Sequence, residues 1–225
     1  MRRLSPDELR ARLKLDFQVC QYMFGAVFSG EAYRTSSDME KRINQITAPT
    51  EGHLARKYRV DFHVKTLIDK GKFADVTTIS FDLDVAGYPF EQPATQILSR
   101  HIPYSPHFKR GAPVCIGEIW RRAQGHMLLG QLLVHIARLL NWDETVRGGG
   151  YVGWNADAIA YHKQVYGDRP LDENLHYPTL PPDLYDIDLN NPHALPESLF
   201  KPISRRPPPP AIDSSLFRGK ERRNG

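Results

Sequence analysis

The chain has 225 residues, of which 40% are hydrophobic and 25% charged, a balance typical of one folded core with appendages. Its 30 Lys and Arg residues against 26 Asp and Glu leave a net charge of +4, too small an excess to indicate nucleic-acid binding by itself. Its two cysteines are too few for a disulfide framework, and no apolar run reaches the roughly 18 residues needed to span a bilayer. We therefore expect one main domain in the cytoplasm, with neither nucleic acid nor a membrane as partner.

The N-terminal residues predict a helix. Ser5-Pro6-Asp7-Glu8 has the form of a capping box with proline in the first turn, and its charges are unlike those of a signal peptide. Apolar residues then recur three and four positions apart, as on one helix face, at Leu9, Leu13, Phe17, Cys20 and Phe24. Because Cys20 belongs to this stripe, we expect it to be a packed core thiol without a chemical role.

The same helix carries a cluster of basic side chains at Arg2, Arg3, Arg10, Arg12 and Lys14. A charged helix face is most often simply solvated, and the alternative is a surface that docks a partner. These residues by themselves do not choose between the two interpretations.

Alternation of apolar and polar residues predicts strands over 60–64 and 79–83, with a shorter strand near 43–47 before them. The turn residues Asp69-Lys70-Gly71-Lys72 lie between the two clearer strands, so we expect those strands to form an antiparallel hairpin. His63 falls on the polar side of its strand and is expected to face solvent.

A proline-punctuated segment follows the hairpin. Tyr88-Pro89-Phe90 and Pro93 interrupt the ladder, because proline fixes φ and lacks an N–H, and a further strand is expected over 95–98. Together these elements predict an antiparallel four-stranded meander. A helix that covers the sheet is then predicted by the apolar spacing of Leu129, Leu132, Leu133, Ile136 and Leu140.

The C-terminal part has a different composition. Gly148-Gly149-Gly150 breaks the chain, Asn155 can cap a further helix, and Gly167 stands where that helix is expected to end. Of the 18 prolines, 11 lie from Pro170 onward, which predicts an extended tail that either wraps the domain or is disordered. We therefore divide the chain into a core at 1–147, a linker with an accessory helix at 148–168, and a proline-rich tail at 169–225.

The segment before the covering helix carries the candidate chemistry. Ser105-Pro106-His107 stands in an irregular loop, His107 lies eight residues before Cys115, and Trp120 lies five residues after it. A cysteine on an accessible loop supported by regular structure is a candidate nucleophile, although a cysteine between Val114 and Ile116 is, taken alone, more often a buried structural thiol. Trp120 is expected to pack under this loop.

This order of elements and motifs resembles the ubiquitin-conjugating enzyme family, in particular its bacterial members, which are encoded beside ubiquitin-like proteins and adenylating enzymes. The resemblance covers roughly residues 5–145 and is carried by Tyr88-Pro89-Phe90, the loop before Cys115, and Trp120. It implies an α+β ubiquitin-conjugating-enzyme-like fold. The family has a His-Pro-Asn motif with its Asn eight residues before the cysteine. Here His107 occupies that register, and two of the three motif residues differ.

The resemblance implies a transferase that carries a ubiquitin-like protein as a thioester on Cys115 and passes it to an amine or another nucleophile, without a cofactor or metal. The implied partners are a ubiquitin-like protein and an adenylating enzyme, and the bacterial likeness implies a role in antiviral defence. His107 would donate a hydrogen bond to the oxyanion or act as a base. Asp143 and Glu144 are candidates for assisting the incoming amine. Candidate docking residues for the adenylating enzyme are Arg10, Arg12 and Lys14.

Other interpretations stay open. A non-catalytic module of the same fold would only hold a ubiquitin-like partner, although such variants usually lack the cysteine. A Cys-His thiol hydrolase would use Cys115 as nucleophile and His107 as base, but no oxyanion-hole glycine turn or helix N-terminus immediately follows the cysteine. His107 could also serve only to hydrogen-bond the loop backbone. A zinc site, for which the paired ligand spacing is missing, would need His101, His107, Cys115 and His126.

Overall fold

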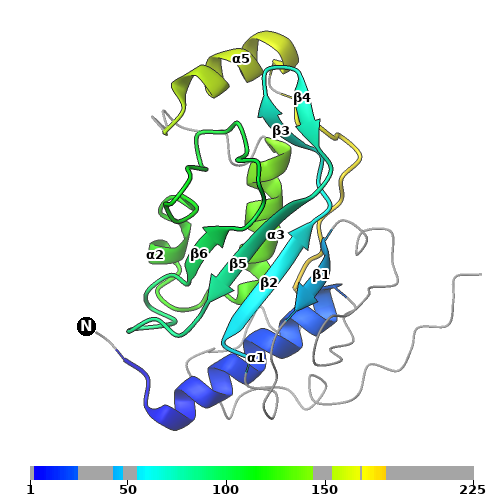
Figure 1. Cartoon of the computed structure of the whole chain (residues 1–225). Coiled ribbons are helices and arrows are strands. Elements are labelled where there is room, and N and C mark those ends of the chain that lie inside the picture. The colour runs from blue at the N-terminus through cyan, green and yellow to red at the C-terminus, as the bar shows by residue number, and fades with distance from the viewer. Residues whose placement is uncertain (1–2, 25–42, 48–54, 144–153, 168, 181–225) are drawn as a thin grey trace, which may run out of the picture.

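The computed structural model describes residues 3–24, 43–47, 55–143, 154–167 and 169–180. They form an α+β structure with an N-terminal helix and antiparallel sheets (Figure 1). Within these ranges no helix is long and apolar enough to cross a membrane. Glu144, the glycine linker and the proline-rich residues 181–225 lie outside the described residues.

Helix α1 (Pro6–Phe24) begins with the predicted capping box. The Glu8 N–H donates to Ser5 Oγ at 3.3 Å, and the Ser5 N–H donates to the Glu8 carboxylate at 2.7 Å. Cys20 is fully buried in the apolar face of the helix, and burial raises the pKa of its thiol well above the ordinary value. Cys20 is therefore a packed core thiol, as predicted.

The main sheet has four antiparallel strands in the order β1–β2–β5–β6, which confirms the predicted meander. Their bounds are β1 (Ile43–Thr47), β2 (Lys57–Phe62), β5 (Thr77–Asp82) and β6 (Ala94–Ile97). On β2 the side chains alternate, with Tyr58, Val60 and Phe62 buried. Alternation of this kind gives the sheet one face that packs against the core.

A second, two-stranded sheet of β3 (Thr66–Asp69) and β4 (Lys72–Ala74) extends the β2–β5 hairpin. Gly71 lies in its turn with φ +71°, a conformation that glycine adopts without strain. The predicted turn is thus confirmed. The pairing of β2 with β5, however, ends before this turn, which belongs to the separate β3–β4 sheet. His63 lies between β2 and β3 and is half-buried, whereas we expected it to face solvent.

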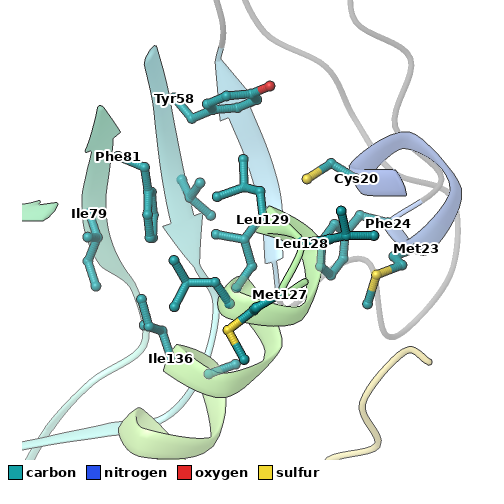
Figure 2. Close-up of a cluster of buried hydrophobic side chains, with 14 of the residues drawn as sticks. Cys20, Met23, Phe24, Tyr58, Ile79, Phe81, Met127, Leu128, Leu129 and Ile136 are labelled. Carbon is teal, nitrogen blue, oxygen red and sulfur yellow. The ribbon is translucent and has the colours of Figure 1, made fainter. Parts of the chain in front are cut away.

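Helix α3 (Leu129–Asn141) covers the sheet, as predicted from its apolar spacing. Figure 2 shows side chains of α1, α3 and the strands meeting in one cluster, where Leu129 and Ile136 face Ile79 and Phe81. At Gly130 an added Cβ would lie 2.6 Å from Met23 Sδ, so glycine permits the close approach of α1 to α3.

The shorter helices are α2 (Ile119–Arg122) and α5 (Ala156–Tyr166). The predicted cap of α5 is present, since the Ala158 N–H donates to Asn155 Oδ1 at 3.1 Å and Gly167 follows with φ +63°. Residues 169–180 have no helix or strand but pack onto the core through Leu175 and Leu180. This part of the predicted tail therefore wraps the domain.

Candidate active site

Two hydrogen bonds join His107 and Cys115 across the loop. The Cys115 N–H donates to the His107 carbonyl at 2.9 Å, and His107 Nδ1 lies 2.9 Å from the Cys115 carbonyl oxygen. Next to them the Val114 N–H donates to Thr95 Oγ1 of β6 at 2.8 Å. The eight-residue spacing in the sequence thus corresponds to a direct bridge, and the bridge closes the loop against the sheet.

Trp120 supports this loop from the core side. Its side chain is buried, its Nε1–H donates to the Pro89 carbonyl at 3.0 Å, and its ring centroid lies 6.0 Å from that of Tyr88. The Tyr88-Pro89-Phe90 motif and Trp120 therefore pack together. This agrees with the expectation that Trp120 is a packing residue.

Helix α5 holds the loop from another side. The Trp154 N–H donates to the Pro106 carbonyl at 3.0 Å, and the rings of Tyr104 and Tyr161 meet edge to face at 6.2 Å. Pro106 precedes His107, so Trp154, two residues before α5 begins, fixes the backbone beside the candidate site. The Trp154 side chain itself is 47% exposed there.

His107 can act as a base in this arrangement. A carbonyl oxygen only accepts hydrogen bonds, so Nδ1 carries the proton, and Nε2 of the neutral ring holds the lone pair. Burial lowers the pKa of His107 below its ordinary value, and the hydrogen bond to Cys115 offsets only part of this effect. The neutral form therefore predominates near pH 7. Donation from Nε2 to an oxyanion, the other role left open, would require the ring to be protonated.

Helix α3 brings a second histidine to the loop, which the sequence analysis missed. His135 hydrogen-bonds to the backbone of Ile116 and lies close enough to His107 for their charges to repel. Burial first, and then His107 and Arg138, lower the pKa of His135 to about 4. Its Nε2 is buried without a hydrogen-bond partner among the described residues. The one available signal was a polar residue inside an otherwise apolar helical run.

The expectation that Arg12 belongs to a docking surface is wrong. Its side chain lies on the inner face of α1, is 3% exposed as a residue, and pairs with Asp16 at 2.9 Å. The guanidinium also donates to the carbonyls of Gly125 and Met127. Burial lowers the pKa of Arg12, but Asp16 and Tyr88 together outweigh burial, so the pKa is raised. A buried charge needs such partners, and Arg12 is structural.

Arg10 and Lys14, the other two candidate docking residues, are exposed on α1. Of the acidic candidates, Asp143 lies just beyond the C-terminal end of α3, where its N–H donates to the Arg138 carbonyl at 3.0 Å. Burial, followed by the nearby Asp143 carboxylate, raises the pKa of Tyr177 to about 12, and the two side chains share a hydrogen bond. Asp143 is therefore engaged by the segment that wraps the domain.

The structure gives no support to the zinc alternative. His126 is exposed, and among the described residues no three or more His, Cys, Asp or Glu side chains are grouped to hold a metal ion. Cys20 and Cys115 are both in the thiol form and are not joined in a disulfide. Of the two, Cys20 is buried and Cys115 is only partly so, which leaves Cys115 as the more accessible thiol and the candidate nucleophile.

Comparisons of this chain with protein-family models, with curated proteins and with solved structures found no match. The function is therefore argued from the residues, the fold and the geometry of the loop.

Proposed function

We propose that this chain is a ubiquitin-conjugating-like transferase, which carries a ubiquitin-like protein as a thioester on Cys115. The observation that carries the proposal is the pair of hydrogen bonds that joins His107 to a partly exposed Cys115 in the register the family uses. The order of an N-terminal helix, an antiparallel meander, a cysteine loop and a covering helix supports the same family fold.

The chemistry needs a thiol with a base beside it. In loading, Cys115 Sγ attacks the carbonyl carbon of the adenylated modifier and the S–C bond forms. The bond from that carbon to the phosphate oxygen breaks, and AMP leaves with its electron pair. The thiol proton passes to a base, for which neutral His107 is the candidate. In transfer, an amine attacks the thioester, the C–N bond forms, and the C–S bond breaks to release the thiolate, which is a good leaving group and takes up the proton that the amine loses.

In this proposal the partners are a ubiquitin-like protein and an adenylating enzyme, with Arg10 and Lys14 as candidate docking residues. A reducing cytoplasm would keep Cys115 as a thiol. The proposed role in antiviral defence rests on the bacterial resemblance. A module that only binds a ubiquitin-like protein would not need an accessible thiol.

A Cys-His hydrolase is the second candidate. Gly117, two residues after Cys115, has φ +65°, and α2 begins at Ile119, so a glycine turn and a short helix follow the cysteine more closely than the sequence indicated. In a hydrolase, water would accept the acyl group in place of an amine. The transferase and the hydrolase therefore differ in what accepts the acyl group from Cys115, an amine or water.

A thioester trap tests the proposal. The protein would be co-expressed with ubiquitin-like and adenylating proteins from its own genome, and its intact mass would be read with and without reductant. We expect an adduct of modifier mass that reductant removes, that Cys115→Ala lacks and that the matched control Cys20→Ala keeps. An adduct that persists in Cys115→Ala would contradict the proposal. No adduct, while the adenylating enzyme is charged and Cys115 reacts with iodoacetamide, would favour the binding module.

A further inference from the structure

The segment around the candidate nucleophile carries a net positive charge. Residues 100–126 hold five Lys and Arg residues against the single carboxylate of Glu118, a net charge of +4 that equals the net charge of the whole chain. The five cations, all exposed, are Arg100, Lys109, Arg110, Arg121 and Arg122.

These five residues, which we call the basic rim, flank Cys115 on both sides in the sequence. Lys109 and Arg110 lie in the loop whose ends are joined by the His107–Cys115 bridge. The Arg110 guanidinium donates to the Arg100 carbonyl at 2.6 Å, which adds Arg100 to the same group. On the other side Arg121 and Arg122 belong to α2, which begins four residues after Cys115.

The basic rim is not neutralised from within. In the part of the chain that the structure describes, Arg121 is the one member in an ion pair with a carboxylate, that of Glu118. Exposed cations whose charge is not compensated raise the local concentration of anionic partners and speed their encounter.

The rim also has a consequence for an amine acceptor. Because like charges repel, a protonated lysine on a neutral or basic protein would be disfavoured beside Cys115. Carboxylates around that lysine would reverse the effect and bring it in.

From this charge pattern we propose that the basic rim docks an acidic segment of the protein that receives the acyl group. The inference rests on the proposed transferase function, which it extends to the class of acceptor. We assign the rim to the acceptor because the modifier is held covalently at Cys115 during transfer, whereas the acceptor must be brought there by binding.

The test pairs a binding arm with a transfer arm. The probes are a fluorescein-labelled peptide with a lysine flanked by glutamates, a matched peptide with glutamines in their place, and a single-stranded oligonucleotide. The variant Lys109→Glu/Arg122→Glu changes two exposed rim residues and keeps the contacts of Arg110 and Arg121. The matched control Lys70→Glu/Lys163→Glu makes the same charge change on the β3–β4 turn and on α5.

In the binding arm, fluorescence anisotropy on the unloaded protein should show tighter binding of the glutamate peptide than of the glutamine peptide. The rim variant should lose about ten-fold in affinity for the acidic peptide, and the control variant much less. The preference should disappear near 1 M salt, where the Debye length is roughly 3 Å. Equal binding of the two peptides would overturn the inference, as would tighter binding of the oligonucleotide.

In the transfer arm, the preloaded thioester is discharged onto each peptide in a single turnover. We expect the acidic peptide to react faster with the wild-type protein and to lose this advantage with the rim variant, while both proteins load equally. Normal loading without any preference among peptides would overturn the docking role and leave the transferase intact. Failure of the wild type to load would instead remove the transferase function, and the binding arm would still decide whether the rim recognises acidic protein.

Discussion

Arg12 and Asp16 form a buried ion pair one helical turn apart, with Nε and Oδ2 separated by 2.9 Å. The same Asp16 carboxylate accepts hydrogen bonds from the Tyr88 hydroxyl at 2.5 Å and from the Leu129 N–H at 2.8 Å. Tyr88 belongs to the segment that supports Trp120, and Leu129 is the first residue of α3. One pair on α1 therefore fixes both the start of the covering helix and the motif beneath the cysteine loop.

Removing one member of this pair should be strongly destabilising, because the other charge is left buried and unpaired. We expect Arg12→Ala and Asp16→Ala each to lower the free energy of unfolding by about 3–5 kcal/mol, measured by urea denaturation. The exposed neighbour Arg10→Ala should cost no more than about 0.5 kcal/mol. A cost for Arg12→Ala as small as that of Arg10→Ala would contradict the structural role.

Gly125 combines a positive φ with a close steric contact. Its φ is +89°, and an added Cβ would lie 2.8 Å from the Phe90 ring, whereas Gly111 has φ +71° with nothing within 4 Å of its Cβ position. Gly111→Ala therefore measures backbone strain alone, about 1 kcal/mol. Gly125→Ala should cost about 1–3 kcal/mol more because Phe90 must move. Equal losses in the midpoint of urea unfolding would show that Phe90 yields without cost.

The parts of this structure that depend on neighbouring residues were predictable from the sequence. The Ser5 capping box, the turn at Gly71 and the cap at Asn155 each involve partners within a few positions. The environment of Arg12 was not predictable, because the carbonyl of Gly125 that it contacts lies 113 residues away along the chain. A helical wheel places Arg12 among other cations and carries no information about that carbonyl.

The candidate site shows the same division. The spacing of His107 and Cys115 is local enough to read from the sequence, and the structure joins the two residues directly. His135 reaches the loop only because α3 packs across the sheet, and its contact with the Ile116 backbone depends on that tertiary arrangement. The apolar periodicity of the sequence places His135 in the helix but does not indicate that it contacts the backbone of Ile116.

Stability should fall in mild acid because of the buried histidines. The pKa of His135 is about 4 in the folded protein against an ordinary value near 6.5, so the unfolded chain binds the proton more readily. Stability is therefore complete above pH 6.5 and is lost as pH falls toward 4, by on the order of 2–3 kcal/mol for this group. His101 and His107, whose pKa values are also lowered, chiefly by burial, act in the same direction.

The variant His135→Asn should flatten part of this pH dependence, as followed by urea unfolding between pH 7 and pH 4. Titration by NMR gives a second check. Because the two histidines repel each other, His107→Asn should raise the pKa of His135, yet burial should keep that pKa below 6.5. An unchanged pH slope in His135→Asn would show that its imidazole carries little of the acid sensitivity.

The role of His107 can be separated into base and donor by its replacement and by pH. As a base, its neutral ring accepts the thiol proton, so loading should rise with pH through the His107 pKa and level off by about pH 7, since that pKa lies below its ordinary value. His107→Asn keeps a donor but no base, and its loading rate should fall about 100-fold. If His107 instead serves as the oxyanion donor, His107→Asn should retain near wild-type loading and His107→Ala should not. Single-turnover loading from a charged adenylating enzyme measures all three proteins. Thermal unfolding of each variant must match the wild type, because His107 also helps to close the Cys115 loop.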